Sequence, residues 1–240
     1  MFTIALIGPD GTGKSTISRE LKNSLPLPAK YIYMGINHSA SNFALPTTLL
    51  WKKIKQASGR QSDMGGPPDP SRNQSLPRDP LKRIAREMKS GFRIANLIAE
   101  EWFRQFVTWY YIARGNIVIF DRHFYFDYYK YHIANYGAGR TLGERLHGFM
   151  LNNIFPKPDL VIFLDAPAEV LFSRKGEGTI ELLEQRRQEY LQFRGRVKQF
   201  VTVDTTQSIG NVTRQISGLI IDFYSSKKGA GEYLSESDVK

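Results

Sequence analysis

The residues best suited to chemistry lie near the N-terminus, in a glycine-rich segment that follows a short apolar run. The stretch GPDGTGKS (residues 8–15) fits the pattern G-x-x-x-x-G-K-[ST]. Its glycines let main-chain N–H groups curl around phosphate oxygens, and the start of a helix adds partial positive charge. A lysine here reaches the β- and γ-phosphates, and the next hydroxyl reaches Mg²⁺. The segment therefore predicts a site for a nucleoside triphosphate with Mg²⁺, whose binding residues are Gly8, Asp10, Gly11, Thr12, Gly13, Lys14, Ser15 and Thr16.

Two further carboxylates follow apolar strand-like runs. Asp121 comes after NIVIF (116–120), and Asp165 comes after LVIFL (160–164). Because parallel strands end at one edge of their sheet, we expect both aspartates to meet the phosphate segment in one cleft. Asp121 could hold a metal-bound water or take part in a structural ion pair; Asp165 could support Mg²⁺ or cap the next helix. The predicted metal-site residues are Ser15, Asp121 and Asp165.

The elements that must position these residues alternate between strands and helices. Helices are expected over about 13–25, 80–114 with a possible break near Gly91, 142–155, 179–199 and 212–224. Strands are expected over 3–7, 29–34, 116–120, 160–164 and 200–203. This alternation predicts an α/β fold, a three-layer doubly wound parallel five-stranded sheet, and the glycine-rich loop after the first strand is typical of a P-loop NTPase.

The predicted organisation is one domain over residues 1–225. A long insertion at about 35–90 is rich in Gly, Pro, Ser and Asn, and a lid is expected at about 174–187. The segment 226–240 is polar and predicts a disordered tail.

The overall composition favours a polyanionic partner, because the formal charge is +10. No nucleic-acid-binding signature accompanies that charge, which argues against a dedicated nucleic-acid binder. The chain has no cysteine, which favours a cytoplasmic location, and its first apolar run reads as a strand rather than a signal peptide. No run of about 18 apolar residues exists that could span a membrane.

Several segments together resemble one known family. The segments GPDGTGKST, IVIFDRH and PDLVIFLDAPAEVLFSRK, followed by a Glu-rich charged helix, are similar to the thymidylate kinase family of P-loop nucleoside-monophosphate kinases. The resemblance covers most of the chain outside about 35–90. It implies an ATP- and Mg²⁺-dependent kinase that transfers the γ-phosphoryl group to a nucleoside monophosphate such as dTMP.

The resemblance also implies roles for single residues. Asp10 would face the acceptor's sugar hydroxyl, although a turn-favouring aspartate would also fit there. Arg122 would clamp the acceptor or transferring phosphoryl group, and Arg174 would lie along the ATP base. The loop itself holds no arginine, so the cation for the transition state would come from the lid, from Arg174, Lys175, Arg186 or Arg187. The implied catalytic residues are Lys14, Asp121, Arg122 and Arg174.

The departures from the family concern the acceptor side. Where the family has an Arg-Glu-Pro-like motif after the second strand, this chain reads YMGINHSAS (33–41). Arg104 and Gln105 are only an approximate counterpart of the family's arginine–glutamine pair. The aromatic run FYFDYYKYH (124–132) could stack on a base, but it fits a core helix better, and His123 fits a packing role better than that of a base.

Three functions remain open at this point. The first is a nucleotide kinase for a pyrimidine monophosphate such as dTMP. The second is a kinase of the same fold for a nucleoside, or for a sugar or lipid-linked acceptor of envelope polysaccharide synthesis, with peripheral membrane contact through the insertion around Trp51. The third is a nucleotide-dependent regulatory module. The resemblance also implies a possible homodimer through helices that flank the sheet.

Overall fold

The computed structural model describes residues 1–37, 41–46, 48, 80–134 and 141–237. The chain falls into two compact units, each described here by itself. The first comprises Met1–Tyr31, Ile112–Ile119 and Asp159–Lys240, and the second comprises Ile32–Tyr111 and Phe120–Pro158. Most of the predicted insertion, including the segment around Trp51, lies outside the described residues.

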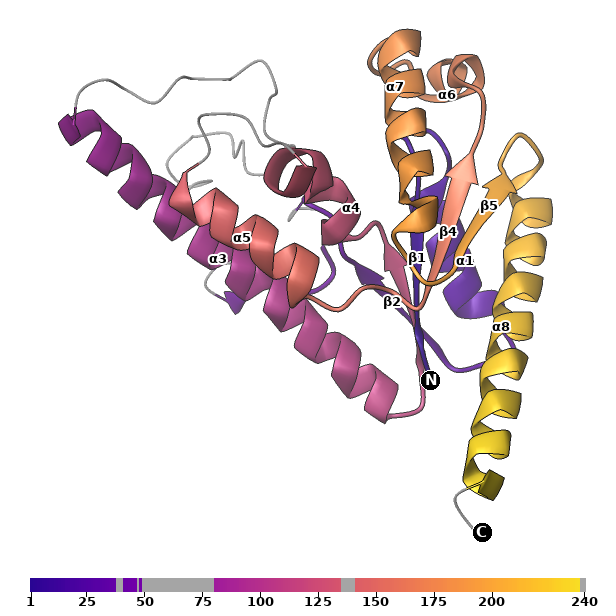
Figure 1. The fold of residues 1–240 in the computed structure, drawn as a ribbon. Coiled ribbons are helices and arrows are strands. Elements are labelled where there is room, and N and C mark those ends of the chain that lie inside the picture. The colour runs from indigo at the N-terminus through magenta and orange to yellow at the C-terminus, as the bar shows by residue number, and fades with distance from the viewer. Residues whose placement is uncertain (38–40, 47, 49–79, 135–140, 238–240) are drawn as a thin grey trace. The chain divides into compact units, whose positions relative to one another are not determined.

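Five strands form one sheet in the order β2-β3-β1-β4-β5 (Figure 1). The strands are β1 (Thr3–Ile7), β2 (Ala29–Tyr33), β3 (Ile117–Asp121), β4 (Leu160–Asp165) and β5 (Phe200–Asp204). β1 pairs in parallel with β4, and β4 pairs in parallel with β5. The chain first builds to one side of β1 and then crosses to the other, so β1 marks the switch point of a doubly wound sheet. The predicted fold class is confirmed.

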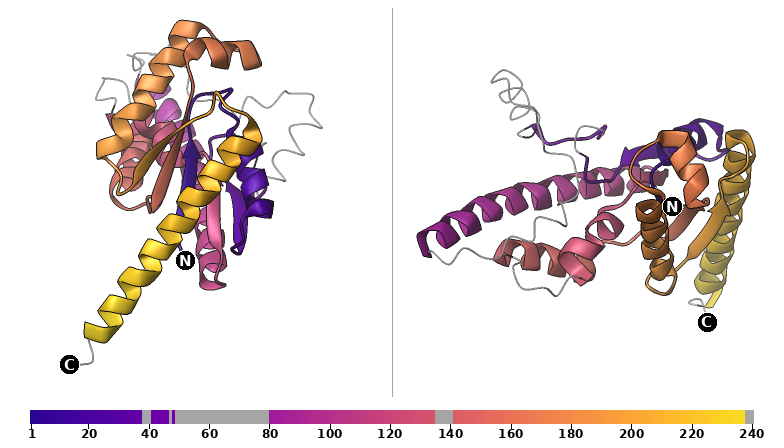
Figure 2. Two further views of the ribbon diagram at one scale, coloured as in Figure 1. Left: turned by 90° about the vertical axis from the view of Figure 1, so that its right-hand side faces the viewer. Right: turned by 90° about the horizontal axis from the view of Figure 1, so that it is seen from above.

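The first unit has helices on both faces of its strands. They are α1 (Lys14–Ser24), α6 (Ala168–Lys175), α7 (Ile180–Leu191) and α8 (Ile209–Ser237). α1 and α8 pack on one face, over a core that includes Leu6, Ile162 and Ile216. On the other face Tyr190 of α7 stacks on Phe163, with ring centroids 5.9 Å apart. Figure 2 shows α8 in yellow along the sheet. The three-layer prediction therefore holds for this unit.

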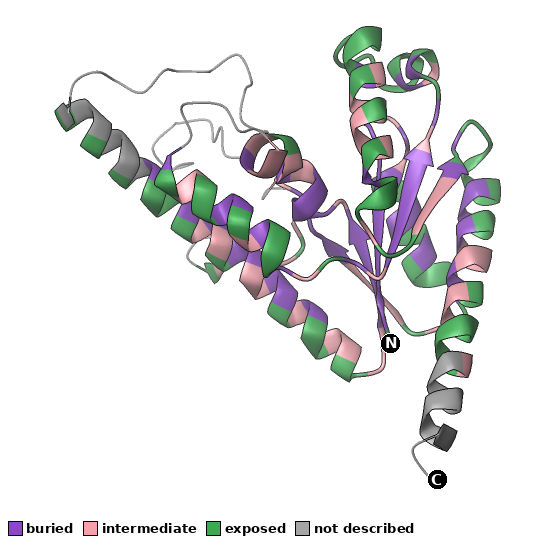
Figure 3. Ribbon diagram, in the orientation of Figure 1, coloured by how far each residue is buried: buried purple, intermediate pink, exposed green. Residues whose placement is uncertain are grey.

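The central strands are apolar because both of their faces are covered. Every residue of β1 and of β3 is buried, as Figure 3 shows in purple. A continuous apolar run is the sequence pattern of such a strand, which is why these strands could be located from the sequence. Each predicted boundary lies within about one residue of the observed one.

Two helices of the first unit end elsewhere than the sequence indicates. The charged helix predicted over 179–199 ends at Leu191 and gives way to a 3-10 turn, Gln192–Gly195, which buries Phe193. α8 runs to Ser237, through part of the segment that was expected to be a disordered tail. Near its end Phe223 packs on Phe2, with ring centroids 4.8 Å apart, and Lys227 lies 2.6 Å from the Asp159 carboxylate. Of these two contacts, the one made by Lys227 lies beyond the predicted helix end at residue 224.

The second unit contains α3 (Pro80–Ala113), α4 (Phe124–Tyr128), the π-helix η1 (Tyr129–Ala134) and α5 (Leu142–Asn153). α3 is uninterrupted, so the break expected near Gly91 is wrong; a side chain there would meet nothing within 4 Å. α5 begins with a capping box formed by Thr141 and Glu144. The aromatic run packs as core, since Phe124, Tyr125, Phe126 and Tyr128 are all buried.

A buried polar chain joins three elements of the second unit. Both carboxylate oxygens of Glu101 in α3 lie 3.0 Å from Nε2 of His147 in α5. Nδ1 of His147 lies 2.6 Å from Nδ1 of His132 in η1, so one of these two nitrogens donates to the other. Close packing accompanies this chain, because a Cβ on Gly148 would lie 2.0 Å from the carbonyl oxygen of His132.

Within the described residues, no helix is long and apolar enough to cross a membrane.

Candidate active site

The glycine-rich loop between β1 and α1 depends on positions where only glycine fits. Gly8, Gly11 and Gly13 have φ angles of 149°, 92° and 83°. A Cβ on Gly8 would lie 2.5 Å from the carbonyl oxygen of Leu164 in β4, and one on Gly11 would lie 3.0 Å from the carbonyl oxygen of Leu171 in α6. The loop is therefore shaped against β4 and α6 without side chains to obstruct its main-chain N–H groups.

The loop's polar side chains are drawn inward. Nζ of Lys14 donates to the carbonyl oxygen of Pro9 at 2.6 Å, and Oγ1 of Thr12 donates to the same oxygen at 2.9 Å. Lys14 is only 4% exposed, although it carries a charge. A buried ammonium held by its own loop is ready to exchange this bond for a phosphate oxygen. Ser15 and Thr16 are exposed on the first turn of α1.

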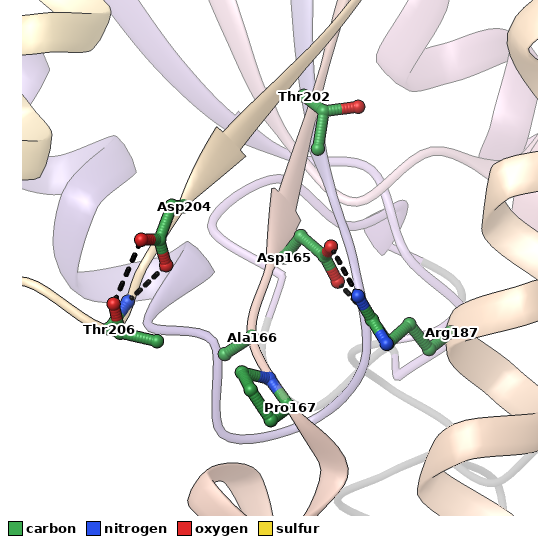
Figure 4. A pocket seen from close by; sticks show the side chains of 7 residues that line it. All are labelled: Asp165, Ala166, Pro167, Arg187, Thr202, Asp204 and Thr206. Atoms are coloured by element: carbon green, nitrogen blue, oxygen red, sulfur yellow. Dashed lines mark hydrogen bonds and ion pairs between the residues drawn. The ribbon is translucent and has the colours of Figure 1, made fainter.

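Two consecutive arginines of α7 pair with carboxylates at the edge of the sheet. Nη1 of Arg186 lies 3.1 Å from Oδ2 of Asp10 in the loop. Arg187 binds Asp165 at the end of β4 with two bonds, Nε to Oδ1 at 2.5 Å and Nη2 to Oδ2 at 2.9 Å (Figure 4). Hydrogen bonding to Asp165 raises the pKa of Arg187. Two cations that were predicted to belong to a lid are therefore fixed beside the loop.

A cavity of about 290 Å³ opens beside this ion pair, at the ends of β4 and β5 (Figure 4). It is lined by Asp165, Ala166, Pro167, Arg187, Thr202, Asp204 and Thr206. Main-chain and side-chain hydrogen bonds from Thr206 lower the pKa of Asp204, which keeps this carboxyl ionised. Near the cavity, Nη2 of Arg174 donates to the carbonyl oxygen of Thr205 at 2.8 Å. This bond ties α6, which carries the arginine predicted to lie along the ATP base, to the segment after β5.

The oxygen donors of the first unit agree only in part with the predicted metal set. The exposed hydroxyl of Ser15 and the carboxylate of Asp165 are hard oxygen ligands of the kind that Mg²⁺ prefers. Asp165, however, uses both carboxylate oxygens to bind Arg187. In the described part of the chain, no group of three or more His, Asp or Glu side chains could hold a metal ion alone. Mg²⁺ is bound mostly through water and substrate phosphates, so the loop fits it when nucleotide is present.

Asp121 and Arg122 belong to the second unit. Asp121 is fully buried at the end of β3, and its carbonyl oxygen accepts a hydrogen bond from the N–H of Met34 at 3.0 Å. Arg122 has a φ of 66°, the one positive value for a non-glycine residue among the described residues. Left-handed backbone costs an arginine on the order of 1 kcal/mol or more and tends to occur at functional positions. The role of Arg122 towards a phosphate stays a prediction.

His123 has a structural role, as the sequence suggested. Its Nδ1 accepts a hydrogen bond from the N–H of Tyr125 at 3.2 Å and so caps α4. The imidazole is fully buried among aromatic rings that include Phe126 and Phe155. Burial lowers the pKa of His123 to about 3, so the ring is neutral at physiological pH. A histidine with so low a pKa, whose Nδ1 already caps a helix, is a poor candidate for a catalytic base.

Arg104 occupies a position that sequence reasoning did not anticipate. Its side chain is fully buried, and it donates to the carbonyl oxygens of Gly35 and Phe43 at 3.2 and 3.1 Å. Glu100, one turn earlier in α3, accepts from the N–H of Leu45 at 3.0 Å. These two residues hold the segment after β2. The sequence gives no signal for this role, since a charged residue on a helix usually faces solvent.

The structure thus groups the predicted residues into two sets. The glycine-rich loop, Asp165, Arg174 and the two α7 arginines lie together in the first unit, whereas Asp121 and Arg122 lie in the second. The strand order places β3 and β4 on either side of β1. That order agrees with the expected convergence of three motifs, which stays a prediction for their side chains.

Sequence comparisons match this chain to thymidylate kinases. A family model described as thymidylate kinase matches residues 52–216, more than half of the chain. The chain is 33% identical over 121 residues to a thymidylate kinase of Thermosipho melanesiensis, and 33% identical over 115 residues to a probable thymidylate kinase of Saccharolobus solfataricus. Each match covers 45% of this chain and 57% of the relative, so the chain spans little more than half the length of these relatives.

Two kinases are among the solved structures that the comparison matches to this chain. One is a thymidylate kinase from Candida albicans, with 19% identity, a TM-score of 0.49 and coverage of 93% of this chain and 92% of that one. The other is a deoxyadenosine kinase from M. mycoides, with 17% identity, a TM-score of 0.47 and coverage of 92% and 99%.

Proposed function

Because the chain belongs to the thymidylate kinase family, we propose that it transfers the γ-phosphoryl group of ATP to a nucleoside monophosphate, with dTMP as the favoured acceptor. Two relatives that are 33% identical over 121 and 115 residues are a thymidylate kinase and a probable thymidylate kinase. The family match begins at residue 52, after the glycine-rich loop. The loop's role therefore rests on its own sequence and geometry.

The observation that carries this proposal is the shape of that loop. Three left-handed glycines and a nearly buried Lys14 stand between a strand and a helix N-terminus. Main-chain N–H groups and one ammonium in this arrangement bind the terminal phosphates of a nucleotide. Mg²⁺, held with the hydroxyl of Ser15, would neutralise charge on these phosphates. Asp121 would orient the attacking oxygen of the acceptor, and Arg122 would clamp its phosphate.

The charged helix α7 would supply the cation for the transition state. Phosphoryl transfer spreads negative charge over the oxygens of the moving group, and a nearby arginine stabilises it. Arg186 is the better candidate, because its pair with Asp10 already places it at the loop. Arg187 is bound through two hydrogen bonds to Asp165 and would act mainly by holding α7 in place.

The direct test is ADP release from ATP and Mg²⁺ in the presence of a panel of acceptors. We expect turnover with dTMP, less with other pyrimidine monophosphates, and none without Mg²⁺. The acceptor-dependent rate should vanish in Lys14→Ala. A wild-type protein that binds ATP but phosphorylates no monophosphate would refute this function, and the absence of turnover with every acceptor would favour a regulatory module.

One observation favours a second candidate, a kinase of the same fold with a different acceptor. Arg104, the approximate counterpart of the family's acceptor-binding pair, is fully buried and bonded to main-chain carbonyls. It therefore cannot reach an acceptor while these bonds persist. The panel should accordingly include nucleosides and sugar or lipid-linked acceptors, and the preferred acceptor decides between the two candidates.

Two finer proposals concern partners and location. We propose a homodimer through α3, because Phe106, Trp109 and Tyr110 of this helix are 59%, 42% and 53% exposed. An enzyme that uses ATP and a nucleotide would find both in the cytoplasm, which we propose as its location. Contact with a membrane through the insertion is a proposal outside the described residues.

A further inference from the structure

Gly35 lies directly against the side chain of Arg122 in the second unit. A Cβ on Gly35 would lie 2.6 Å from Cδ of Arg122 and 2.7 Å from the hydroxyl oxygen of Tyr33. Contacts this short do not occur between packed atoms, so any larger residue would displace one of these side chains. The φ of Gly35 is not among the positive values, so this glycine is needed for space rather than for its backbone conformation.

The peptide of Gly35 is fixed from its other side by Arg104. Nη1 of Arg104 donates to the Gly35 carbonyl oxygen at 3.2 Å, and Nε donates to the Phe43 carbonyl oxygen at 3.1 Å. The guanidinium is fully buried, and it lies 3.5 Å from the carboxylate of Glu100. A buried fork of donors with an acidic partner is a rigid support, because losing either bond would leave a charged group unsatisfied.

The backbone at Arg122 is held just as firmly. The N–H of Met34 bonds to the carbonyl oxygen of Asp121 at 3.0 Å, which joins the end of β2 to the residue before Arg122. Arg122 itself stays in the left-handed region at φ 66°. Such a conformation persists only where the surrounding structure imposes it. The backbone of Arg122 is therefore held in place, and Gly35 supports its side chain at Cδ.

We propose that Gly35 and Arg104 are positioning residues that hold the Arg122 guanidinium in place for the phosphate of a monophosphate acceptor. The inference rests on the proposed function, in which Arg122 binds that phosphate. Arg104 acts through Gly35, and Gly35 acts through its contact with Cδ of Arg122. Tyr33 and Gly35, at the start of the segment that lacks the acceptor motif of the family, thus lie against the acceptor-binding arginine.

The first experiment reads the position of Arg122 without any need for activity. The Nε–Hε signal of Arg122 is recorded by NMR in the full chain and assigned by its loss in Arg122→Lys. Gly35→Ala should shift or broaden this signal. Gly91→Ala is the matched control, because a Cβ there meets nothing within 4 Å. An Arg122 signal that is unchanged in Gly35→Ala would overturn the inference, whatever the enzyme's substrate proves to be.

The second experiment is a double-mutant cycle in acceptor kinetics. Gly35→Ala should lower kcat/KM for the acceptor on the order of ten- to a hundredfold, because a small displacement of a clamp is costly, while the KM for ATP stays the same. In the Arg122→Ala background the same change should cost less than about twofold. Equal losses in both backgrounds would show a merely structural role and overturn the inference.

Arg104→Lys supplies an independent variant that keeps the charge but loses the two-pronged geometry. We expect it to raise the acceptor KM and shift the Arg122 signal in the wild-type chain, with thermal unfolding used to confirm that the variant is folded. A folded Arg104→Lys protein with an unchanged Arg122 signal would remove Arg104 from the inference. If the wild type phosphorylates no monophosphate, the proposed function fails, and the NMR experiment still decides whether Gly35 positions Arg122.

Discussion

Arg187 holds both carboxylate oxygens of Asp165, through hydrogen bonds of 2.5 and 2.9 Å that run side by side. This pair links α7 to the end of β4 and uses one lone pair on each carboxylate oxygen of Asp165. It is partly exposed, with side chains 28% and 17% accessible, so its contribution to stability is modest. While the pair persists, Asp165 could support Mg²⁺ only through the second lone pair of each oxygen.

Replacing Lys14 should weaken nucleotide binding with little effect on folding. In Lys14→Ala the loop loses the only cation that it carries itself, and we expect the affinity for ATP to fall on the order of a hundredfold or more. Lys22→Ala, an exposed lysine in the last turn of the same helix, is the control and should behave like wild type. Titration of ATP binding by calorimetry measures both, and equal affinities would contradict the loop's assigned role.

A methyl group on Gly8 should distort the loop. Gly8→Ala places a Cβ 2.5 Å from the carbonyl oxygen of Leu164 at a φ of 149°, so β1 and β4 would be pushed apart at the loop. We expect a lower melting temperature and weaker ATP binding. Gly210→Ala makes the same chemical change where nothing lies within 4 Å and should leave both unchanged. Matching melting temperatures for the two variants would count against this packing.

Breaking the contact between Asp10 and Arg186 should slow the reaction more than it destabilises the protein. The pair is partly exposed, so Arg186→Gln should change the free energy of unfolding by about 1 kcal/mol or less. It should lower kcat by at least about tenfold, because the transferring group loses its cation. Arg214→Gln, at an exposed site on α8, is the control. If Arg186→Gln kept a normal kcat, the cation that stabilises the transition state would have to be another residue.

The stability of the protein should decline as the pH falls from about 6.5 towards 3. The unfolded chain protonates His123 near pH 6.5, whereas burial lowers the pKa of His123 in the folded protein to about 3. The unfolded state then binds the extra proton, and stability falls by up to about 1.4 kcal/mol per pH unit across this window.

His123→Asn keeps an acceptor for the N–H of Tyr125 but cannot titrate, so its stability should depend less on pH in that range. His123→Phe loses the cap as well and should be less stable at every pH. Chemical unfolding between pH 4 and 8 compares the three proteins. A wild-type slope identical to that of His123→Asn would mean that His123 is not buried as described.

The proposed homodimer predicts a dependence on the apolar face of α3. Phe106→Glu places a charge at a side chain that is 59% exposed in the single chain and should shift the protein towards a monomer. Leu182→Glu, at a residue of α7 that is 40% exposed, is the control. Sedimentation velocity over a range of concentrations measures the mass. A wild-type protein that is monomeric throughout that range would exclude the dimer.

The strands and the glycine-rich loop could be predicted because their signals are local. β1, β3 and β4 are short apolar runs; the glycine-rich loop follows β1, and β3 and β4 end at Asp121 and Asp165. The helix over 179–199 was predicted too long because its charged pattern continues past Leu191, whereas the 3-10 turn is set by the burial of Phe193. The contact that extends α8, between Lys227 and Asp159, joins residues 68 positions apart. Contacts of this range leave no mark on a local pattern.

The roles of Arg104 and Gly35 were hidden for a related reason. On a helix an arginine normally extends into solvent, and only the fold shows that Arg104 lies buried under two carbonyl oxygens. Gly35 lies in a segment rich in turn residues, where one more glycine carries no information. The sequence reveals which residues can take part in chemistry. The residues that orient them can be identified only from the contacts they make in the folded structure.

Gly148 sets a limit on how the second unit can diverge in evolution. The wide turn of η1 brings the carbonyl oxygen of His132 to within 2.0 Å of where a Cβ on Gly148 would lie. A larger residue at position 148 would be tolerated only if the path of η1 changed as well. Two mutations would then be needed together, which is rare. We therefore expect lineages that keep the His132–His147 pair to keep this glycine as well.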